Sequence, residues 1–318
     1  MRIVFMGTPE FAVPSLAALL GSAHKVVGVV TQPDRPKGRG QEVAASPIKQ
    51  LAERHKLPIL QPLKMKDPVF LDALSVWKPD LIAVAAFGRI LPKVILDLPP
   101  RGCINVHASL LPKYRGAGPI QWAIIRGEQE SGITTMLMDE GMDTGAILLQ
   151  ETVPIAPEDT AGTLSAKLAE VGGRLLIETL ARLERGALAP QPQDHARATM
   201  APLLKKDDGL LDWSQPAPDL ANRIRGLTPW PGAHTYLGDD RWVIWKASAQ
   251  DRLAAAGPPG TITNASKEGL LVATGSGILR VTEFQPANSR RMTAAQYLAG
   301  HRLAPGLKLG PPPPTATA

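Results

Sequence analysis

Cysteine is nearly absent from this sequence, because the 318 residues contain one, Cys103. A single cysteine excludes an internal disulfide framework and suits a reducing compartment. Metal-binding patterns are missing too, since the six histidines are scattered along the chain and no Cys-x-x-Cys pair exists. We therefore expect a protein without a structural or catalytic metal ion.

Long apolar runs are also lacking. No stretch approaches the roughly 18 apolar residues that a membrane-spanning helix needs, and the opening MRIVFMGTPEF has too short an apolar run for a signal peptide. The first strand–helix turn, GTPEF, does not have the G-x-G-x-x-G pattern of a dinucleotide site. We expect a cytoplasmic protein with no membrane partner, and a monomer.

The composition that remains is that of an ordinary globular protein. At 44% hydrophobic and 20% charged residues, the chain can bury a substantial core. The net charge of +6 permits a polyanionic partner without requiring one. A slightly basic enzyme with no nucleic-acid role explains the charge equally simply.

The first part of the chain, residues 1–186, alternates apolar strands with amphipathic helices. This order predicts an α/β domain with a Rossmann-like, mostly parallel sheet and helices on both faces. Ligands of such sheets bind beyond the carboxyl ends of the strands. The strands that matter here are expected at 2–7, 25–32, 81–87 and 102–107, and helices at 9–22, 46–57, 68–80 and 160–186.

The pattern changes after residue 186. Residues 187–208 lose periodicity and gain Pro, Ala and charge, which predicts a linker. In 209–309, short strand-like segments at intervals of about ten residues predict a small antiparallel barrel or sandwich. We expect the barrel, similar to an OB fold, and a disordered tail at 310–318. Residues 209–318 hold 11 Lys and Arg against 7 Asp and Glu. An RNA-contacting barrel and a purely structural one both remain open.

Two polar residues end the strand expected at 102–107. Alternating residues of a strand share a face, so Cys103, Asn105 and His107 point one way and Ile104 and Val106 the other. An amide N–H and an imidazole at a ligand-binding edge can stabilise an oxyanion. Both residues can equally be structural polar groups at a strand end.

The segments that follow add two further candidates. Ser109–Pro112 can present main-chain donors and acceptors to a planar heterocycle. The glycine-flanked loop 138–147 contains Asp139 and Asp143. A carboxylate from this loop that faces His107 could relay a proton. Aspartates in such turns are also common simple turn formers. Cys103 lies about 13 Å along the strand from His107, and we expect a buried, inert thiol rather than a nucleophile.

The connection at 31–47 is long for an α/β protein and is rich in proline and glycine. It carries Arg35, Lys37 and Arg39, whose charges suit phosphate contacts on an exposed loop. A solvated basic loop without a partner is the alternative.

Taken together, these stretches resemble the formyltetrahydrofolate-dependent formyltransferases. The similarity lies in NVHASLLPKYRGAGP (105–119) and MDEGMDTG (138–145), and it continues in FMGTPEFAVPSL, TQPDRPKGRGQ, AFGRILP and IRGLTPWPGA. It covers nearly the whole chain except the Pro-rich tail. The basic loop and the appended barrel are similar to those family members whose acceptor is methionyl initiator tRNA.

The resemblance implies a reaction and roles for residues. The amine of methionyl initiator tRNA would attack the formyl group of 10-formyltetrahydrofolate, and no metal would be needed. Asn105 and His107 would stabilise the oxyanion, and Asp143 would set the charge of His107 and assist proton transfer. Folate contacts are implied for Ser109, Leu110, Leu111, Pro112, Phe87 and Gly88. Contacts with tRNA are implied for Arg35, Lys37 and Arg39, and for the positive face of the barrel.

Overall fold

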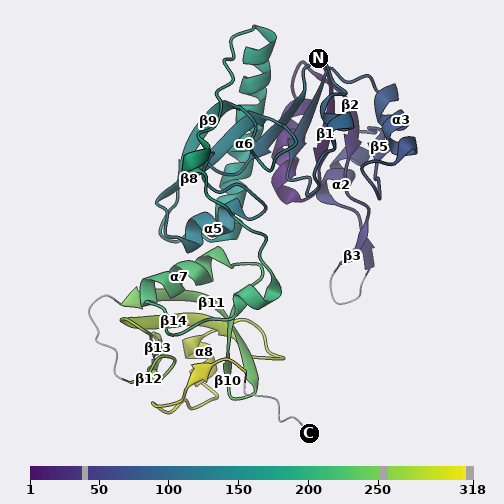
Figure 1. The fold of residues 1–318 in the computed structure, drawn as a ribbon. Helices are drawn as coiled ribbons and strands as arrows, with labels where there is room; N and C mark the ends of the chain where they lie inside the picture. The colour runs from purple at the N-terminus through teal and green to yellow at the C-terminus, as the bar shows by residue number, and fades with distance from the viewer. Residues whose placement is uncertain (38–41, 251–256, 313–318) are drawn as a thin grey trace. The chain divides into compact units, whose positions relative to one another are not determined.

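The computed structural model describes residues 1–37, 42–250 and 257–312, and it divides the chain into two compact units. Each unit is built on its own sheet (Figure 1). The first comprises Met1–Pro119, Glu130–Pro154 and Ser165–Pro202, and the second comprises Ile120–Gln129, Ile155–Leu164 and Leu203–Ala318.

The sheet of the first unit has seven strands in the order β5-β2-β1-β6-β7-β8-β9. Neighbours from β5 to β7 are parallel, whereas β7, β8 and β9 pair antiparallel. The predicted mostly parallel sheet is therefore confirmed, with an antiparallel edge. The strands are β1 (Arg2–Gly7), β2 (Lys25–Val30), β5 (Ile59–Leu60), β6 (Leu81–Ala85), β7 (Cys103–His107), β8 (Glu130–Leu137) and β9 (Ile147–Pro154).

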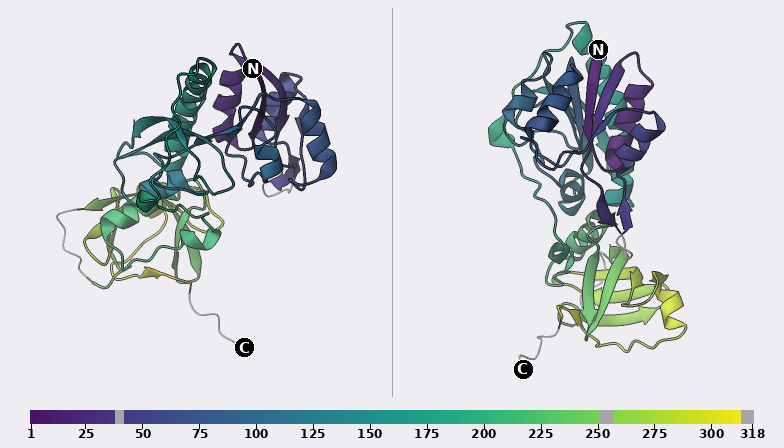
Figure 2. Two further views of the ribbon diagram at one scale, coloured as in Figure 1. Left: turned by 45° about the horizontal axis from the view of Figure 1, so that its top comes forward. Right: turned by 90° about the vertical axis from the view of Figure 1, so that its right-hand side faces the viewer.

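Helices cover both faces of this sheet, as Figure 2 shows in its right-hand view. Helices α3 (Pro68–Val76) and α4 (Lys93–Leu96) share an apolar cluster with Val4, Ile82 and Cys103 on one face. The other face meets α6 (Ala161–Glu184), where Gly172 lies against Val106. The 3-10 turn η1 (Glu10–Ala12), α1 (Val13–Leu20) and α2 (Pro47–Arg54) complete the layers.

A glycine pair inside α6 has a packing role. A Cβ on Gly173 would stand 2.8 Å from the backbone oxygen of Pro14, and one on Gly172 would stand 2.9 Å from Val106. Glycine costs roughly 1 kcal/mol in a helix interior relative to alanine. Here that cost is offset because the pair lets α6 lie close to the start of α1 and to the sheet.

Local capping explains where two of the helices begin. The hydroxyl of Ser46 accepts a hydrogen bond from the backbone N–H of Lys49, and Pro47 occupies the first helical position of α2. Asp67 caps α3 in the same way through the N–H of Val69. The first turn of each helix thereby gains a partner for one of its unsatisfied donors.

The sheet of the second unit is antiparallel, in the order β12-β13-β14-β11-β10-β16, with β15 paired to β14. Hydrogen bonds from Ile262 to Leu307 and from Leu309 to Gly260 join its two ends. The predicted small barrel is thus confirmed. Its strands are β10 (Ala233–Leu237), β11 (Asp240–Gln250), β12 (Ile262–Ser266), β13 (Gly269–Ala273), β14 (Ile278–Gln285), β15 (Met292–Thr293) and β16 (Leu309–Gly310).

Aromatic side chains fill the barrel. The rings of Trp242 and Phe284 stack with centroids 4.6 Å apart, and Tyr297 meets both edge-on. Tyr297 belongs to α8 (Ala294–Leu298), which thereby closes one side of the core. The unit also contains α5 (Pro119–Ile125), α7 (Ala217–Gly226) and the short turn η3 (Lys206–Gly209).

The domain boundaries drawn from the sequence stay a prediction. The structure assigns two short segments from within the predicted first domain, Ile120–Gln129 and Ile155–Leu164, to the second unit. The predicted linker 187–208 contains the turn η2 (His195–Arg197). Of the predicted tail, Gly310 belongs to β16, and 313–318 lie outside the described residues.

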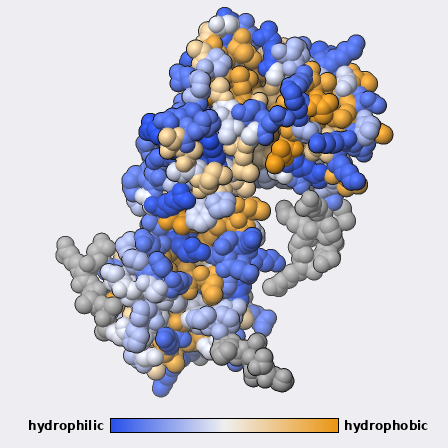
Figure 3. Space-filling model, viewed as in Figure 1, coloured by the Kyte–Doolittle hydropathy of each residue, from blue (hydrophilic) through white to orange (hydrophobic). Residues whose placement is uncertain are grey.

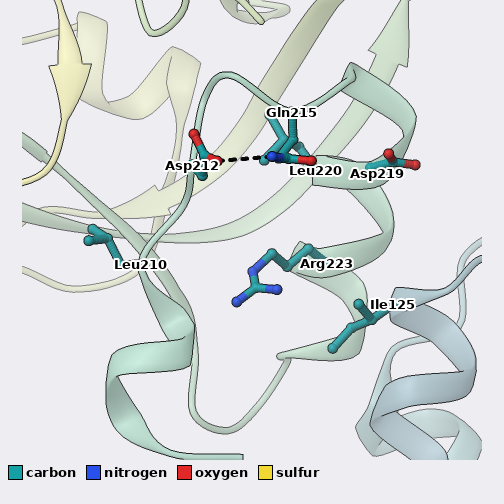
Figure 4. A pocket seen from close by; sticks show the side chains of 7 residues that line it. All are labelled: Ile125, Leu210, Asp212, Gln215, Asp219, Leu220 and Arg223. Carbon is teal, nitrogen blue, oxygen red and sulfur yellow. Dashed lines mark hydrogen bonds between the residues drawn. The ribbon is translucent and has the colours of Figure 1, made fainter. Parts of the chain in front are cut away.

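A cavity of about 350 Å³ lies in the second unit (Figure 4). Arg223 reaches toward its centre, and Asp212 accepts a hydrogen bond from Gln215 at its rim. Leu210, Asp219, Leu220 and Ile125 complete the lining. None of the candidate catalytic residues from the sequence lines it.

Several large apolar side chains are exposed on the stretch that holds α3 and α4. Figure 3 shows such apolar surface interspersed with polar surface on the face in view. The exposed apolar side chains of this stretch are Leu63, Val69, Val76, Ile90 and Val94.

Among the described residues, no helix combines the length and the apolar character needed to cross a membrane.

Candidate active site

The end of β7 presents its residues as the period-two pattern predicted. The Sγ of Cys103 lies 3.7 Å from the backbone oxygen of Ile95 in α4, on one face of the sheet, and Val106 lies against α6 on the other. Asn105 and His107 share the Cys103 face. His107 is the last residue of β7, so its side chain stands at the carboxyl edge of the parallel strands.

The loop between β8 and β9 brings Asp143 to that edge. Its Oδ1 lies 3.5 Å from Asn105 Nδ2 and 3.6 Å from His107 Nδ1. Its Oδ2 accepts a hydrogen bond from the N–H of Gly116 at 2.8 Å. The structure therefore brings together the three side chains that the sequence proposed for catalysis, and a backbone amide holds the carboxylate from the other side.

The two longer contacts exceed the 2.7–3.2 Å of an ordinary N–H···O bond. His107 and Asp143 are 6% and 16% exposed, so little water competes at the site. Catalytic hydrogen bonds are often loose before substrate binds. Asn105 Nδ2 and His107 Nδ1 thus lie close to the Asp143 carboxylate but form no short hydrogen bond with it.

The position of one proton on His107 follows from its neighbours. Its Nε2 lies 3.0 Å from the backbone oxygen of Tyr114, which can only accept, so Nε2 carries a hydrogen. The other nitrogen, Nδ1, faces Asp143. Nδ1 is therefore the ring nitrogen that a substrate can reach beside the carboxylate.

The backbone of the Asp143 loop restricts which residues can occupy it. Asp143 has φ +54°, in the left-handed region that Asp tolerates better than most residues. A Cβ on Gly145 would stand within bonding range of the backbone oxygen of Leu137, so only glycine fits there. Asp139, the other candidate in the loop, is exposed and accepts hydrogen bonds from Gly141 and Thr144. Asp139 is thus a turn former.

The segment Ser109–Pro112 is held firmly in place. Thr134 donates to the backbone oxygen of Ser109 at 2.6 Å and accepts from the N–H of Leu111 at 3.1 Å. Gln150 donates to the backbone oxygen of Leu111. These main-chain groups already have protein partners, which hold the backbone of the segment rigid. The predicted folate contacts of Ser109–Pro112 stay a prediction.

Phe87 and Gly88 follow β6, the neighbour of β7. The amide of Gln32 donates to the backbone oxygen of Phe87 at 2.9 Å and lies 3.4 Å from that of Gly88. Phe87 is buried, and Gly88 has φ +74°. Both lie at the same carboxyl edge as His107, and their predicted folate contacts stay a prediction.

Cys103 is buried, with 1% of its surface exposed. Burial, aided by the negative charge of Asp97, raises the pKa of its thiol to about 12. A thiol with that pKa forms almost no thiolate near neutral pH, so it cannot serve as a nucleophile.

We expect a thiol reagent such as DTNB to leave Cys103 unmodified in the folded protein and to label one thiol per chain in guanidinium chloride. A Cys103→Ala variant should keep the wild-type kcat. Rapid labelling of the native protein would contradict the burial of this side chain.

The basic loop forms a hairpin of β3 (Arg35–Lys37) and β4 (Glu42–Ala44). Its base is fixed, because Asp34 accepts hydrogen bonds from Lys49 of α2 and from Gln61. These two bonds lower the pKa of Asp34. The predicted tRNA contact Arg39 lies outside the described residues.

Sequence reasoning missed one contributor to the site, Gln193. It lies in the predicted linker, yet it is 6% exposed and hydrogen-bonded to the Asp143 loop and to Arg115. The stretch 190–193 reads PQPQ, and neither glutamine carries a periodic signal that could have revealed this.

With this geometry in place, comparison with known proteins decides the family. Residues 1–180 match the model described as formyl transferase, and residues 203–302 match that of the formyl transferase C-terminal domain. The chain belongs to the formyl transferase family. One relative, the methionyl-tRNA formyltransferase of Desulfotalea psychrophila, is 52% identical over 95% of this chain and 94% of its own length.

Solved structures share the fold of this formyl transferase. The methionyl-tRNA formyltransferase from Clostridium thermocellum matches 80% of this chain and 95% of its own with a TM-score of 0.55 and 18% identity. HypX from Aquifex aeolicus in complex with tetrahydrofolic acid matches 94% of this chain and 47% of its own with a TM-score of 0.61 and 20% identity. In the described part of this chain, no cluster of three or more metal-ligating side chains occurs.

Proposed function

We propose that this formyl transferase moves the formyl group of 10-formyltetrahydrofolate onto the α-amine of methionyl initiator tRNA. One observation carries the proposal. Over nearly the whole chain, about half of the residues are identical to those of proteins named methionyl-tRNA formyltransferase. The match to one of these relatives covers 99% of this chain, so it spans both the basic hairpin and the C-terminal barrel. The product would be formylmethionyl-tRNA for translation initiation.

Asn105 and His107 would stabilise the charge that develops on the formyl oxygen. Each amide nitrogen carries two hydrogens, so Asn105 can donate to substrate while one hydrogen still points to Asp143. His107 would donate from Nδ1, since Nε2 is engaged by Tyr114. Donors fixed in a water-poor site are worth far more than the same donors in water.

Asp143 would take part in moving the proton released by the attacking amine. A new C–N bond forms to the amine, the bond from the formyl carbon to the folate nitrogen breaks, and a proton passes from the amine to the folate nitrogen. Asp143 is the carboxylate nearest to His107 Nδ1, at 3.6 Å. It can hold that proton in transit and balance the charge of the imidazolium.

The folate would bind along the carboxyl edge of the parallel strands, against Ser109–Pro112, Phe87 and Gly88. The segment fits a planar ligand because Thr134 and Gln150 fix its backbone from behind. The tRNA would contact Arg35, Lys37 and Arg39 of the segment 31–47 and the basic face of the barrel. We further propose that the enzyme acts as a cytoplasmic monomer, in keeping with its one buried, unpaired cysteine.

The deciding experiment supplies the protein with 10-formyltetrahydrofolate and methionyl initiator tRNA. N-formylmethionine should be released when the tRNA is deacylated. Parallel reactions offer an amino-sugar nucleotide and glycinamide ribonucleotide as acceptors. Formylation of a small amine with no formylation of the tRNA would refute the proposed acceptor.

Replacing Arg39 with alanine should raise the KM for methionyl-tRNA and leave the KM for the folate unchanged. Each phosphate contact makes binding more sensitive to salt. Losing one contact should reduce the slope of log KM against log salt concentration by about 1. KM measured across a range of KCl concentrations tests both effects. Arg54→Ala removes the same charge from the exposed end of α2 and should change neither; a changed folate KM in Arg39→Ala would mean that the loop serves the folate instead.

A further inference from the structure

We propose that Gln193 is a positioning residue that holds Asp143 in place for formyl transfer, and that Arg115 orients Gln193. The inference rests on the proposed role of Asp143 in that reaction. It concerns a segment that the sequence predicts as a plain linker, 187–208. The residues involved all belong to the first unit.

The side-chain amide of Gln193 spans the backbone of the Asp143 turn. Its Nε2 donates to the backbone oxygen of Asp143 at 2.9 Å and to that of Gly145 at 2.7 Å. Both hydrogens of the amide are thereby used on one loop. Since Gln193 is 6% exposed, water does not substitute readily for either bond.

The Asp143 turn needs such support. At φ +54°, a residue other than glycine costs roughly 1–2 kcal/mol, and it keeps that conformation only where its surroundings enforce it. The carboxylate itself is anchored by one short bond, from the N–H of Gly116. The two carbonyl contacts from Gln193 fix the backbone from which this carboxylate projects.

Arg115 decides which way the amide of Gln193 points. Its Nε and a terminal nitrogen donate to Gln193 Oε1 at 3.1 and 2.7 Å. A guanidinium has donors and no acceptor, so the oxygen must face Arg115 and the NH₂ must face the Asp143 loop. Among the described residues no carboxylate pairs with Arg115, which is 6% exposed. No carboxylate among these residues therefore competes with Gln193 for the guanidinium of Arg115.

A second acceptor completes the surroundings of Arg115. His195 Nδ1 lies 3.2 Å from both terminal nitrogens of the guanidinium. Because these nitrogens only donate, Nδ1 must offer its lone pair. Arg115 is thus fixed by two neutral side chains from one segment.

Backbone pairing holds this segment across the site. Gln191 exchanges two backbone hydrogen bonds with Ile147 at the start of β9, at 2.8 and 2.9 Å. Further along, the N–H of Arg115 donates to Thr199 and its carbonyl accepts from Ala201. The segment is therefore tied down on both sides of Gln193, which makes the amide a rigid support.

The consequence for catalysis concerns Asp143 Oδ1. It lies 3.5 and 3.6 Å from Asn105 and His107, so a small shift of the loop would remove it from reach of both. A misplacement of about 1 Å can cost about 10²-fold in rate. Such a loss would appear in kcat rather than in the binding of either substrate.

The test is a Gln193→Glu variant, which is nearly isosteric. A carboxylate keeps the contact with Arg115, but its second oxygen faces the carbonyl oxygens of Asp143 and Gly145 and repels them. We expect kcat to fall by about 10–100-fold with both KM values changed by less than about threefold. Gln191→Glu adds the same charge to an exposed side chain of the same segment and should match the wild type.

A double-mutant cycle separates positioning from general stability. If Gln193 acts through Asp143, adding Gln193→Glu to Asp143→Asn should lower kcat no further. An additive loss, or a wild-type kcat in Gln193→Glu, would overturn the inference. Should Gln193→Glu not fold, Gln193→Met, which lacks the donors without adding charge, takes its place; failure of both to fold would assign Gln193 to stability and also overturn it. Formylation of methionyl-tRNA by the wild type tests the proposed function separately.

Discussion

Replacing Asn105 with alanine should lower kcat for formyl transfer by about 10²–10³-fold, the usual cost of removing one fixed oxyanion donor. Asn105 suits this test because its side-chain amide makes only a loose contact with Asp143, at 3.5 Å, among the described residues. The truncation therefore leaves no tightly bonded partner unsatisfied. Thermal unfolding should show a Tm close to that of the wild type, and the KM for each substrate should change little.

His107→Ala should lower kcat at least as far, because it removes a proposed oxyanion donor and the imidazole that faces Asp143. It should also destabilise the protein by about 1–3 kcal/mol, since the buried hydrogen bond between His107 Nε2 and the backbone oxygen of Tyr114 is lost. His55→Ala, at the exposed end of α2, is the matched control and should leave kcat and Tm unchanged.

Steady-state kinetics with methionyl-tRNA distinguish these expectations. A near-normal kcat in Asn105→Ala would mean that the amide is a structural polar group at the end of β7. A loss in His107→Ala that follows Tm alone, and disappears at lower temperature, would assign His107 to folding. The two variants thus separate the catalytic interpretation of the strand end from the structural one.

The fold was predictable where periodicity carries the information. Apolar runs such as 81–85 specified buried strands, and the helix expected at 46–57 is observed as α2. The direction of β8 and β9 was not predictable in this way. A strand's hydrophobic pattern is the same whether it runs parallel or antiparallel to its neighbour, and direction is set by the path of the connecting chain. Here that path includes Ile120–Gln129, which belongs to the second unit.

The sequence predicted those site residues that lie close together along the chain, and it predicted distant ones less well. Two-residue spacing placed Asn105 and His107 on one face without any knowledge of the fold. Asp143 is 36 residues from His107, and the family resemblance, rather than the spacing, singled it out from Asp139. Gln193 acts through contacts 48 to 78 residues away, to Gly145 and Arg115, and such contacts leave no trace in a single sequence.

Asp143→Asn should lower kcat by about 10²–10⁴-fold, the range for a group that assists proton transfer. Asparagine is the right replacement because it tolerates the left-handed backbone at φ +54°, whereas alanine would add strain. The remaining oxygen can still accept from the N–H of Gly116. The variant therefore removes the negative charge beside His107 and turns an NH₂ group toward Asn105, with the loop kept in place.

Asp139→Asn provides the comparison within the same loop. Asp139 also accepts hydrogen bonds from its own turn, but it is exposed, and its carboxylate bonds to Gly141 and Thr144 rather than to Asn105 or His107. Its variant should keep the wild-type kcat, with Tm lowered by a few degrees at most. Equal losses in the two variants would show that loop geometry alone matters. A large loss confined to Asp143→Asn would locate the requirement in the carboxylate that faces His107 Nδ1.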